Sequence, residues 1–376
     1  MKILYICNEY PPLPHGGIGS FTKLIAENLI IRNHEVVVVG YGDKSTTYIE
    51  VLNGVKVVRL KNEKKDYGSI MNYFNMVVSR IVFYRKVMKY VHEFKPDLIE
   101  TYDWSAPLII KPRRITLITR LHGSNTANNI YIGLEKTPIL HLLELKSIKQ
   151  SDYIVSVSDH IAEITQKTFG INFKYKTIYN GVDTIKFFNQ KRERDLNKIL
   201  LVGRMHPFKG FDELFKALNF LFSNHNTLHL QVVCTVIESY KNELLSFVEP
   251  KFYKRIEFAG RVPNSFLIDY YNQANLSVIP SRAEALGIIA LESMACGTPV
   301  IISNRAAASE IVDNELNGFL VDTSNPKTFA ERILDILKDQ NKIELMREKC
   351  RIKILEKFSI EKVINENINF YESIIA

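Results

Sequence analysis

Two glutamates, Glu284 and Glu292, stand eight positions apart in the stretch Ser281–Pro299. The residues between them are mostly apolar, which predicts a buried helix, and Gly297 followed by Pro299 predicts where that helix ends. An ionised carboxylate accepts hydrogen bonds, so a carboxylate facing two neighbouring hydroxyl groups suits a ribose or a hexose. The alternative is that Glu284 is a solvated loop residue and Glu292 an exposed position on the helix.

The start of the same predicted helix could hold an anion. Asn275–Ser281 is predicted to be a strand, so Arg282–Gly287 forms a loop at the carboxyl end of a strand, where α/β proteins bind ligands. The backbone N–H groups of Leu286, Gly287 and Ile288 have no partner within the helix, and together with the helix dipole they favour a diphosphate. The glycine lets a phosphate come close.

A second loop supplies complementary positive charge. Lys198–Val202 is predicted to be a strand, and the loop Gly203–Gly210 that follows it contains Arg204 and Lys209, five positions apart. Arginine as a fork and lysine as a point charge can both address one oxyanion group. An anion site flanked by two acceptors for hydroxyl groups describes a nucleotide sugar.

The first half of the chain carries another loop at the end of a strand. Residues 8–19 contain three prolines and three glycines, and they expose the backbone at Gly16 and Gly17. A dinucleotide-binding fingerprint is the competing interpretation, because Gly17 and Gly19 match its first two glycines. Its third glycine would fall at Thr22, which argues against it.

A histidine follows directly after a later strand of this half. His122 comes after the predicted strand Ile115–Leu121 and precedes a glycine, a position from which its side chain can reach into a cleft. Asp103 similarly follows the predicted strand before it. A lone histidine is often structural, and that is the alternative, but this position favours a function.

Strand and helix signals alternate along both halves of the chain, which predicts parallel sheets covered by helices. A chain of 376 residues is long for one core and suits two α/β domains. The charged run Gln190–Asp195 is the predicted linker, so we place the domain boundary after residue 189. Ile360–Ile375 is the last predicted helix.

Composition limits the possible classes of protein. With 46% hydrophobic and 24% charged residues, the chain has the composition of a soluble globular protein. No apolar run approaches the roughly 18 residues that a membrane-spanning helix needs. The four cysteines are scattered without a Cys-x-x-Cys pair, which argues against a zinc site, a disulfide framework and export. We therefore expect a cytoplasmic protein.

The net charge of +8 is unevenly distributed. Residues 1–195 contain 28 lysines and arginines against 19 acidic residues, whereas residues 196–376 contain 21 against 22. The excess in the first half predicts an anionic partner, either lipid headgroups or a phosphorylated or acidic substrate. Nucleic acid fits less well, because the chain has no recognised nucleic-acid module and no arginine-rich tract.

One basic segment of the first half, Gly68–Phe94, has aromatic, aliphatic and basic residues at helical spacing. It could be an amphipathic basic helix that lies on an anionic membrane. The alternative is a core helix with a solvated basic face. The residues concerned are Tyr73, Phe74, Phe83, Tyr84 and Tyr90 with Arg80, Arg85, Lys86 and Lys89.

The motifs, in this order and spacing, resemble family 4 of the retaining glycosyltransferases, which have the GT-B fold. The resemblance rests on the glycine-rich loop after the first strand, on Arg204 and Lys209, and on the two glutamates followed by Ser-Met-Ala-Cys-Gly-Thr-Pro-Val. It covers nearly the whole chain and is most specific over Glu284–Val300.

The resemblance implies an α/β fold of two Rossmann-like, doubly wound domains that face each other across a cleft. Residues 1–189 would bind the acceptor, and the C-terminal helix, residues 360–376, would cross back to this first domain. Residues 190–359 would bind the nucleotide sugar.

The resemblance also implies roles for single residues. Arg204 and Lys209 would bind the diphosphate, Glu292 the ribose hydroxyls, and Glu284 the donor sugar. Further donor contacts are implied from the backbone of Gly16, Gly17, Leu286, Gly287 and Ile288, from the backbone of Val262 to the base, and from His122 near the donor sugar.

The reaction implied is transfer of a hexose-type sugar with retention of configuration to a glycan or lipid-linked acceptor, in the synthesis of a cell-surface polysaccharide or glycolipid. A front-side route places the catalytic burden on stabilising the departing diphosphate, a role for the two cations of the loop and the helix start. The chain contains no Asp-x-Asp, so we expect neither a metal nor another cofactor. Family frequency favours a UDP-sugar over a GDP-sugar as donor.

Two departures from the family pattern bear on the donor. The family more often has Gly-Phe where this chain has Ala285-Leu286, and it commonly has two glycines where this chain has Asn304–Ser309. The second change alters a loop near the donor sugar. The alternatives to a transferase are a non-catalytic GT-B protein that binds a nucleotide sugar or a partner enzyme, and a GT-B epimerase or phosphorylase. Peripheral attachment to the inner face of the membrane would account for the basic first half.

Overall fold

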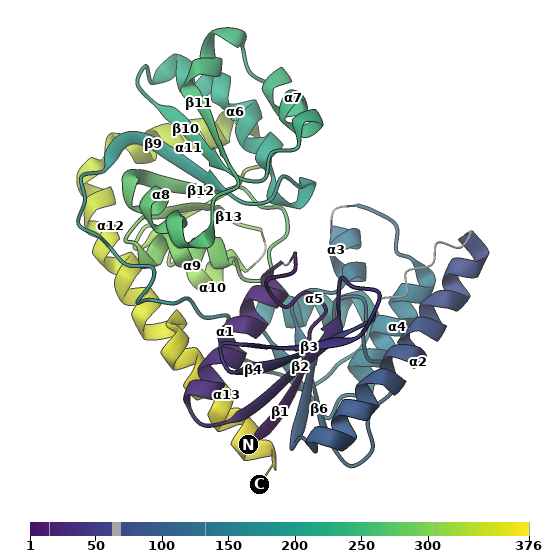
Figure 1. The fold of residues 1–376 in the computed structure, drawn as a ribbon. Coiled ribbons are helices and arrows are strands. Elements are labelled where there is room, and N and C mark those ends of the chain that lie inside the picture. Colours follow the sequence, from purple (N-terminus) through teal and green to yellow (C-terminus); the bar gives the residue numbers. More distant parts are fainter. Residues whose placement is uncertain (15, 62–68, 132, 306, 376) are drawn as a thin grey trace. The chain divides into compact units, whose positions relative to one another are not determined.

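The structure, a computed structural model, describes residues 1–14, 16–61, 69–131, 133–305 and 307–375. Its contacts divide the chain into two compact units, Met1–Tyr179 with Ile364–Ala376, and Asn180–Val363. In each unit helices cover both faces of a largely parallel sheet, as predicted (Figure 1).

The sheet of the first unit has eight strands in the order β3-β4-β2-β1-β5-β6-β7-β8. All neighbouring strands are parallel except β3 and β4, which form an antiparallel hairpin at the edge. The strands are β1 (Lys2–Ile6), β2 (Glu35–Tyr41), β3 (Tyr48–Leu52), β4 (Val55–Leu60), β5 (Leu98–Tyr102), β6 (Thr116–Leu121), β7 (Tyr153–Ser156) and β8 (Lys176–Thr177). The helices are α1 (Gly17–Ile31), α2 (Ser69–Phe94), α3 (Asn125–Tyr131), α4 (Pro138–Lys149) and α5 (Asp159–Phe169).

The sheet of the second unit has six parallel strands in the order β11-β10-β9-β12-β13-β14. These are β9 (Asp195–Val202), β10 (His229–Val233), β11 (Ile256–Gly260), β12 (Ala274–Ile279), β13 (Val300–Ser303) and β14 (Gly318–Val321). The helices are α6 (Phe211–Asn224), α7 (Glu238–Ser246), α8 (Leu267–Gln273), α9 (Ile288–Ala295), α10 (Ala308–Ile311), α11 (Pro326–Lys338) and α12 (Gln340–Lys353), with short turns η1 (Pro207–Lys209), η2 (Pro250–Arg255), η3 (Asn264–Phe266) and η4 (Ile354–Phe358).

The strand order decides where the functional loops lie. Strand order reverses between β9 and β12, which are neighbours in the sheet although they are far apart in the sequence. The loops after these two strands therefore emerge side by side at the carboxyl edge of the sheet, the place where doubly wound folds bind ligands. Both carry residues that the sequence analysis selected.

The last helix, α13 (Ile360–Ile375), begins in the second unit, and its residues from Ile364 onward belong to the first. A buried polar cluster fixes this part to the sheet. The Arg120 guanidinium donates to Glu100 at 2.7 Å and to Asn367 of α13 at 2.5 Å. The Tyr371 hydroxyl donates to the same glutamate at 2.7 Å, so the buried ion pair is closed by two side chains of α13.

The unit boundary lies ten residues before the predicted one at 189, because residues 180–189 pack on the second unit. The N–H of Val182 donates to the Phe358 carbonyl at 2.9 Å. The Arg351 guanidinium donates to the carbonyls of Thr184 and Phe187, at 2.9 and 2.7 Å. A charged run indicated a linker, but these backbone contacts come from distant residues and leave no local signal.

The basic segment is helix α2, and the structure supports the core-helix interpretation. Phe83 and Tyr90 are buried in the hydrophobic core of the first unit, together with apolar residues of β1, β2 and β4. Their rings are therefore not free to enter a bilayer. Arg85 and Lys89 are exposed. Gly68 and the side chain of Tyr73 lie outside the described residues.

Candidate active site

Two loops of the second unit are held against each other at the carboxyl edge of the sheet. The loop after β12 donates the Arg282 N–H to the Phe208 carbonyl of the loop after β9, at 2.7 Å. Gly210 ends the β9 loop with a φ of +63°, and a Cβ on it would lie 2.0 Å from the Pro280 carbonyl oxygen. Only glycine allows this approach, because any side chain would meet the backbone of the facing loop.

This close packing brings Lys209 and Glu284 together. Their side chains form an ion pair with Nζ and Oε2 2.5 Å apart, and the Ser281 hydroxyl donates to the same carboxylate oxygen at 3.4 Å. The lysine and glutamate side chains are 18% and 19% exposed. The pair is thus shielded enough to be strong and open enough for a ligand to take over either charge. The sequence analysis assigned both residues to the donor but did not foresee that they pair.

Arg204 lies on the same loop and is exposed. In the described part of the chain it has no hydrogen-bond or ion-pair partner, so its guanidinium is available to an anion. The His206 ring, stacked on Phe208, lies between the two cations in the sequence. Partial burial lowers the pKa of His206, and the charges of Arg204 and Lys209 lower it further. The loop therefore carries two positive charges and a neutral imidazole near neutral pH.

Helix α9 begins directly after the β12 loop, at Ile288. Gly287 precedes it with a φ of +94°, in the left-handed region that favours glycine, and Leu286 is buried. Among the described residues none accepts a hydrogen bond from the N–H groups of Leu286, Gly287 or Ile288. These donors and the helix dipole are the features from which the sequence predicted an anion site, and the binding of an anion there stays a prediction.

Glu292 lies one turn into α9 and is 7% exposed, so it is not an exposed helix position. Its carboxylate accepts from the Tyr271 hydroxyl at 2.9 Å and from the Asn264 side chain at 3.3 Å. Burial raises the pKa of Glu292, and the hydrogen bonds from Tyr271 and Asn264 and the charge of Lys186 oppose this only in part. Because the cost of burying this charged carboxylate is only partly offset by its present hydrogen bonds, further hydrogen bonds from the hydroxyl groups of a ligand would be favourable.

We expect Tyr271→Phe to move the acid limb of donor kcat/KM to higher pH. The tyrosine hydroxyl stabilises the ionised form of Glu292, so its loss raises the pKa of Glu292 further. The ionised form, which accepts from hydroxyl groups, is then lost earlier as pH falls. A pH profile of Tyr271→Phe beside Tyr270→Phe, a tyrosine on the same helix, tests this. Identical acid limbs in both variants would contradict a ligand-binding role for the Glu292 carboxylate.

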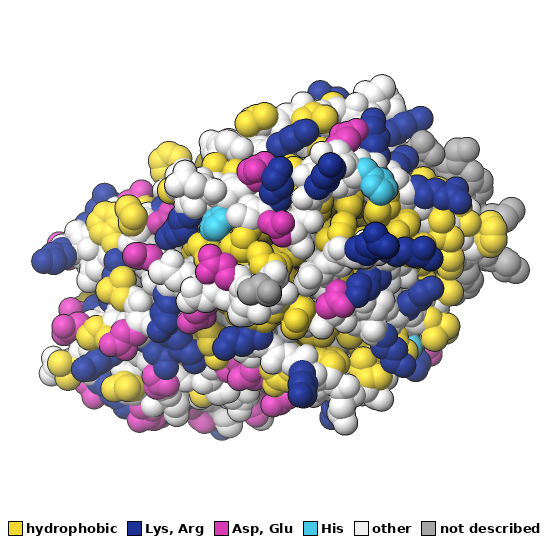
Figure 2. Space-filling model, turned by 90° about the horizontal axis from the view of Figure 1, so that it is seen from below, with side chains coloured by type: hydrophobic (Ala, Val, Ile, Leu, Met, Phe, Trp, Pro, Cys, Tyr) yellow, Lys and Arg dark blue, Asp and Glu magenta, His cyan; other side chains and the backbone are white. Residues whose placement is uncertain are grey.

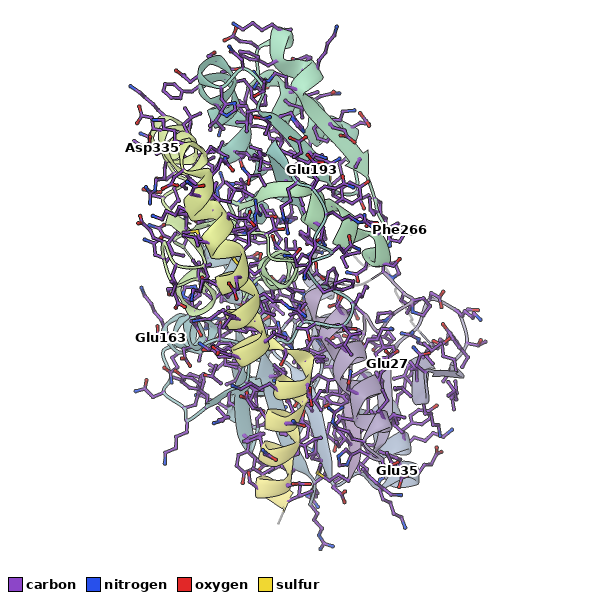
Figure 3. All side chains as sticks on the ribbon, turned by 90° about the vertical axis from the view of Figure 1, so that its left-hand side faces the viewer. Glu27, Glu35, Glu163, Glu193, Phe266 and Asp335 are labelled. Atoms are coloured by element: carbon purple, nitrogen blue, oxygen red, sulfur yellow. The ribbon has the colours of Figure 1, made fainter. Side chains whose placement is uncertain are left out.

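The loop after β11 supplies the neighbours of Glu292. Val262 is half-buried in this loop, and its predicted backbone contact to a base stays a prediction. Asn264, two residues further, bonds both Glu292 and the Lys186 ammonium. Phe266 of the same loop is 56% exposed and stands out from the second unit (Figure 3). The sequence analysis missed Asn264, Tyr271 and Lys186, because only the fold brings them to Glu292.

His122 belongs to the first unit, in the loop after β6. The backbone N–H of His122 donates to one oxygen of the Asp103 carboxylate at 2.9 Å, and the backbone N–H of Gly123 donates to the other oxygen at 3.2 Å. The ring meets Phe21 edge-on, with centroids 5.3 Å apart. Burial, reinforced by the charge of Arg120, lowers the pKa of His122 to about 3. The imidazole is therefore neutral and can exchange hydrogen bonds with a hydroxyl group, but it is not a cation.

The glycine-rich loop of the first unit is organised by Glu9. Its carboxylate accepts from the N–H of Gly16 at 2.9 Å and from the N–H of Gly19 at 3.1 Å. Gly16 is therefore already engaged as a donor. The N–H groups of Gly17 and Ile18, at the start of α1, have no acceptor among the described residues. The sequence analysis missed Glu9, although an acid at the end of a strand and before a glycine loop is a usable signal.

The two α/β units, each built on a largely parallel sheet, define a protein of the GT-B fold. Two family models cover most of the chain: "Glycosyl transferases group 1" matches residues 182–353, and "Glycosyltransferase Family 4" matches residues 15–186. The chain belongs to glycosyltransferase group 1, and it is a glycosyltransferase.

Known relatives and solved structures are similar to this chain along nearly its full length. An uncharacterized glycosyltransferase of Methanocaldococcus jannaschii is 27% identical over 99% of this chain and 98% of its own. The sucrose-phosphate synthase of Thermosynechococcus elongatus is 18% identical with a TM-score of 0.84, over 99% of this chain and 98% of its own. Anabaena HepE, solved in complex with UDP and glucose, is 19% identical with a TM-score of 0.78, over 99% of this chain and all of its own. These structural likenesses concern the fold.

Proposed function

We propose that this protein is a retaining glycosyltransferase that moves a hexose-type sugar from a nucleotide-diphosphate sugar to a glycan or lipid-linked acceptor, in cell-surface polysaccharide or glycolipid synthesis. One observation carries the proposal: the Lys209–Glu284 pair, 2.5 Å apart, lies beside the amino end of α9, whose first N–H groups have no acceptor among the described residues. A cation, a carboxylate and free N–H donors in one place suit a diphosphate joined to a hydroxyl-bearing sugar.

The second unit would hold the donor. Its diphosphate would take over Lys209 from Glu284, add Arg204, and accept from the N–H groups of Leu286, Gly287 and Ile288. The released Glu284 carboxylate would then accept from hydroxyls of the donor sugar. Glu292 would accept from the ribose, and the backbone of Val262 would contact the base.

The first unit would contribute the remaining donor contacts and the acceptor. Gly17, whose N–H has no acceptor among the described residues, would donate to the diphosphate, whereas Gly16, engaged by Glu9, would contribute the space that a close approach needs. The neutral imidazole of His122 would bond a hydroxyl of the donor sugar.

In the reaction, the bond between the anomeric carbon of the sugar and the diphosphate breaks, a bond from the acceptor oxygen to that carbon forms on the same face, and the proton of the acceptor hydroxyl passes to the departing phosphate oxygen. The negative charge that develops on the diphosphate is stabilised by Lys209, Arg204 and the amino end of α9. Fixed charges and N–H groups of this kind lower the barrier without reorganising during the step. We propose that no metal takes part, because these groups can neutralise the diphosphate. Turnover that survives chelation would support this, and turnover that requires added Mg²⁺ or Mn²⁺ would contradict it.

The proposed donor is a UDP-sugar. Its support is the set of Anabaena HepE structures, which were solved with UDP, with UDP and glucose, and with UDP-glucose. The donor sugar itself is left open by the loop at 304–309, where this chain lacks the glycines common in the family.

Release of the nucleotide from a panel of UDP- and GDP-sugars, with and without candidate acceptors, tests the proposed function. We expect release of UDP that depends on an acceptor and is lost in Glu284→Ala and Lys209→Ala. Binding of donors without any turnover would indicate a non-catalytic GT-B protein. Conversion of one nucleotide sugar into another without an acceptor would indicate an epimerase. Cleavage of a sugar substrate that depends on inorganic phosphate would indicate a phosphorylase.

We also propose that the first unit rests on an anionic membrane surface. No helix of the described residues is long and apolar enough to cross a bilayer. Exposed apolar side chains, Phe74, Leu134 and Leu142, belong to the same unit as the exposed Arg85 and Lys89. Figure 2 shows apolar side chains interspersed with lysine and arginine, and with some acidic side chains, on one face of the molecule.

Sedimentation with vesicles tests this attachment. We expect the protein to sediment with anionic vesicles at low salt and to be released by high salt, because screening weakens attraction between exposed charges. Equal sedimentation with neutral vesicles would remove electrostatic attraction as the cause.

A further inference from the structure

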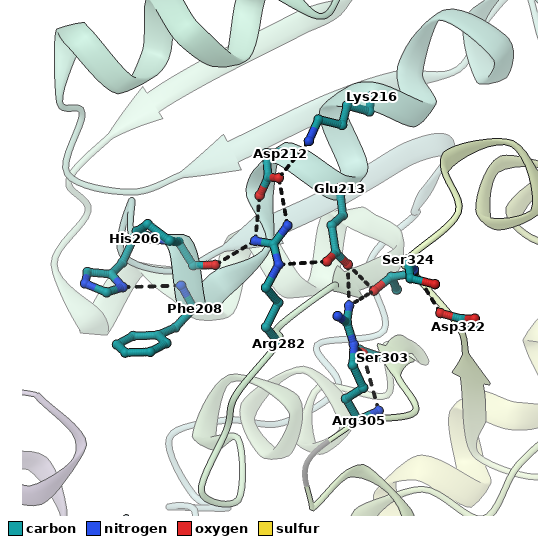
Figure 4. Close-up of polar contacts among 12 residues, drawn as sticks. His206, Phe208, Asp212, Glu213, Lys216, Arg282, Ser303, Arg305, Asp322 and Ser324 are labelled. Atoms are coloured by element: carbon teal, nitrogen blue, oxygen red, sulfur yellow. Dashed lines mark hydrogen bonds and ion pairs between the residues drawn. The ribbon is translucent and has the colours of Figure 1, made fainter. Parts of the chain in front are cut away.

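A charged cluster lies next to the Lys209–Glu284 pair, and the sequence analysis gave its members no role. It contains two acids at the start of α6, Asp212 and Glu213, and two arginines, Arg282 after β12 and Arg305 after β13 (Figure 4). Thr323, after β14, joins them. The cluster therefore links segments that follow four strands of the sheet.

Arg282 is the member of the cluster that connects the two loops of the proposed donor site, the loop after β9 and the loop after β12. Its backbone N–H donates to the Phe208 carbonyl at 2.7 Å, and Nη1 donates to the Pro207 carbonyl at 2.8 Å. These two carbonyls belong to the turn η1 that ends in Lys209. Arg282 itself is only two residues from Glu284, so one residue fixes the backbone carrying the lysine against the backbone carrying the glutamate.

The rest of the Arg282 guanidinium is occupied by acids. Nη1 and Nη2 donate to the two oxygens of Asp212, at 2.8 and 2.7 Å, and Nε forms an ion pair with Glu213 at 2.9 Å. A guanidinium has five N–H groups, and three of them donate hydrogen bonds here, while Nε faces Glu213 in the ion pair. Arg282 therefore cannot grip a diphosphate as a fork without breaking these contacts, which separates its role from that of Arg204.

Glu213 is shared by both arginines. Its second oxygen accepts from Arg305 Nη2 at 2.5 Å and from the Thr323 hydroxyl. The Glu213 side chain is 8% exposed, so an unpaired charge there would be costly, and each arginine is held in place. Arg305 lies in the loop where the family commonly has glycines. In this chain Arg305 bonds Glu213 and Thr323 from that loop.

We infer that Arg282 and Arg305 are positioning residues of the donor site. Arg282 holds Lys209 at bonding distance from Glu284, and Arg305 holds the following loop through the shared carboxylate of Glu213. The two acids at the start of α6 serve as the common anchor. This inference rests on the proposed function, because it assigns the cluster to the binding of the donor diphosphate.

The experiment compares Arg282→Lys, Asp212→Asn and Arg305→Lys with Arg332→Lys, using the full chain. Arg332 forms an exposed ion pair with Glu315 on the same unit and is the matched control. The measurements are the Kd for UDP by calorimetry, the KM for donor and for acceptor, and the melting temperature. Lysine keeps the charge of Arg282 but cannot reach Pro207, Asp212 and Glu213 together.

We expect Arg282→Lys to raise the Kd for UDP and the donor KM by about tenfold or more, since a small displacement of a binding group is costly, with acceptor KM within about twofold of the wild type. Asp212→Asn should also raise the Kd for UDP and the donor KM while leaving the acceptor KM nearly unchanged, but by a smaller factor. Arg305→Lys should raise the donor KM. The control Arg332→Lys should behave as the wild type. The double variant Arg282→Lys/Asp212→Asn should lose less than the two single losses combined.

Folded Arg282→Lys and Asp212→Asn proteins with wild-type Kd for UDP would overturn the inference and leave the proposed function intact. Equal losses toward donor and acceptor, together with a lower melting temperature, would also overturn it by indicating a purely structural cluster. If Arg282→Lys does not fold, Asp212→Asn, which keeps the side-chain shape, decides by the same criteria. A wild-type protein that neither binds UDP nor turns over any nucleotide sugar would instead remove the proposed function.

Discussion

Lys209→Ala is expected to lower kcat/KM for the donor by about 10²- to 10³-fold, the usual cost of removing one group that stabilises a developing oxyanion. The wild-type lysine forms an ion pair with Glu284 at 2.5 Å and is only 18% exposed, so its charge is held at that point of the site. Its removal also leaves the Glu284 carboxylate unpaired beside the incoming diphosphate. The measurement is steady-state turnover of the donor identified by the panel.

Because part of the Lys209→Ala loss is repulsion, the double variant Lys209→Ala/Glu284→Gln should bind UDP more tightly than Lys209→Ala alone, although its turnover stays low. Lys241→Ala, which removes a lysine paired with Glu238 on the same unit, is the control and should retain activity. Wild-type turnover in Lys209→Ala would contradict the assignment of the diphosphate site. UDP binding equally weak in both Lys209→Ala variants would show that repulsion by Glu284 plays no part.

Gly210→Ala is expected to reduce donor kcat/KM by about 100-fold or more, the scale of a displacement of about 1 Å in the site. The added Cβ would lie 2.0 Å from the Pro280 carbonyl oxygen, so one of the two donor loops must move. Lys209, the preceding residue, then shifts away from Glu284. The left-handed φ of +63° adds about 1 kcal/mol of strain for a residue with a side chain.

Gly170→Ala is the control that separates the effect of backbone strain from the effect of a steric clash between the added Cβ and a neighbouring atom. Gly170 has nearly the same φ, +61°, at the end of α5 in the first unit, and a Cβ there would meet nothing within 4 Å. This variant should lose about 1 kcal/mol of unfolding free energy and keep its activity. Equal kcat/KM for Gly210→Ala and the wild type, with both proteins folded, would show that the register of the two loops does not matter for catalysis.

The parallel architecture was predictable from the sequence because glycine and proline mark the ends of its strands and helices. Gly297 indicated the end of α9, and its φ of +69° confirms a left-handed cap. The hairpin of β3 and β4 was missed, although Asn53-Gly54 is a strong signal for a two-residue turn, and both residues have positive φ. That signal was present and unused.

Only part of the candidate site could be predicted from the sequence as a set of neighbouring residues, and the roles of those residues stay predictions. Lys209 and Glu284 come together because two strands distant in the sequence are adjacent in the sheet, which the alternation of elements predicts. Their ion pair, and the contacts of Glu292 with Tyr271 and Asn264, depend on side-chain directions that no local pattern encodes. The aromatic residues of α2 show that a local pattern can also be ambiguous. Their spacing fits both a helix that lies on a membrane and the core helix that the structure contains.

The central claim is that one diphosphate is bound by Lys209, Arg204 and the amino end of α9, and a crystal structure of the protein with UDP tests it most directly. We predict phosphate oxygens within about 3 Å of the Lys209 ammonium and of a backbone N–H among Leu286, Gly287 and Ile288, with ribose hydroxyls at the Glu292 carboxylate. UDP bound elsewhere, with Lys209 still paired to Glu284 and the start of α9 without a phosphate, would contradict the account.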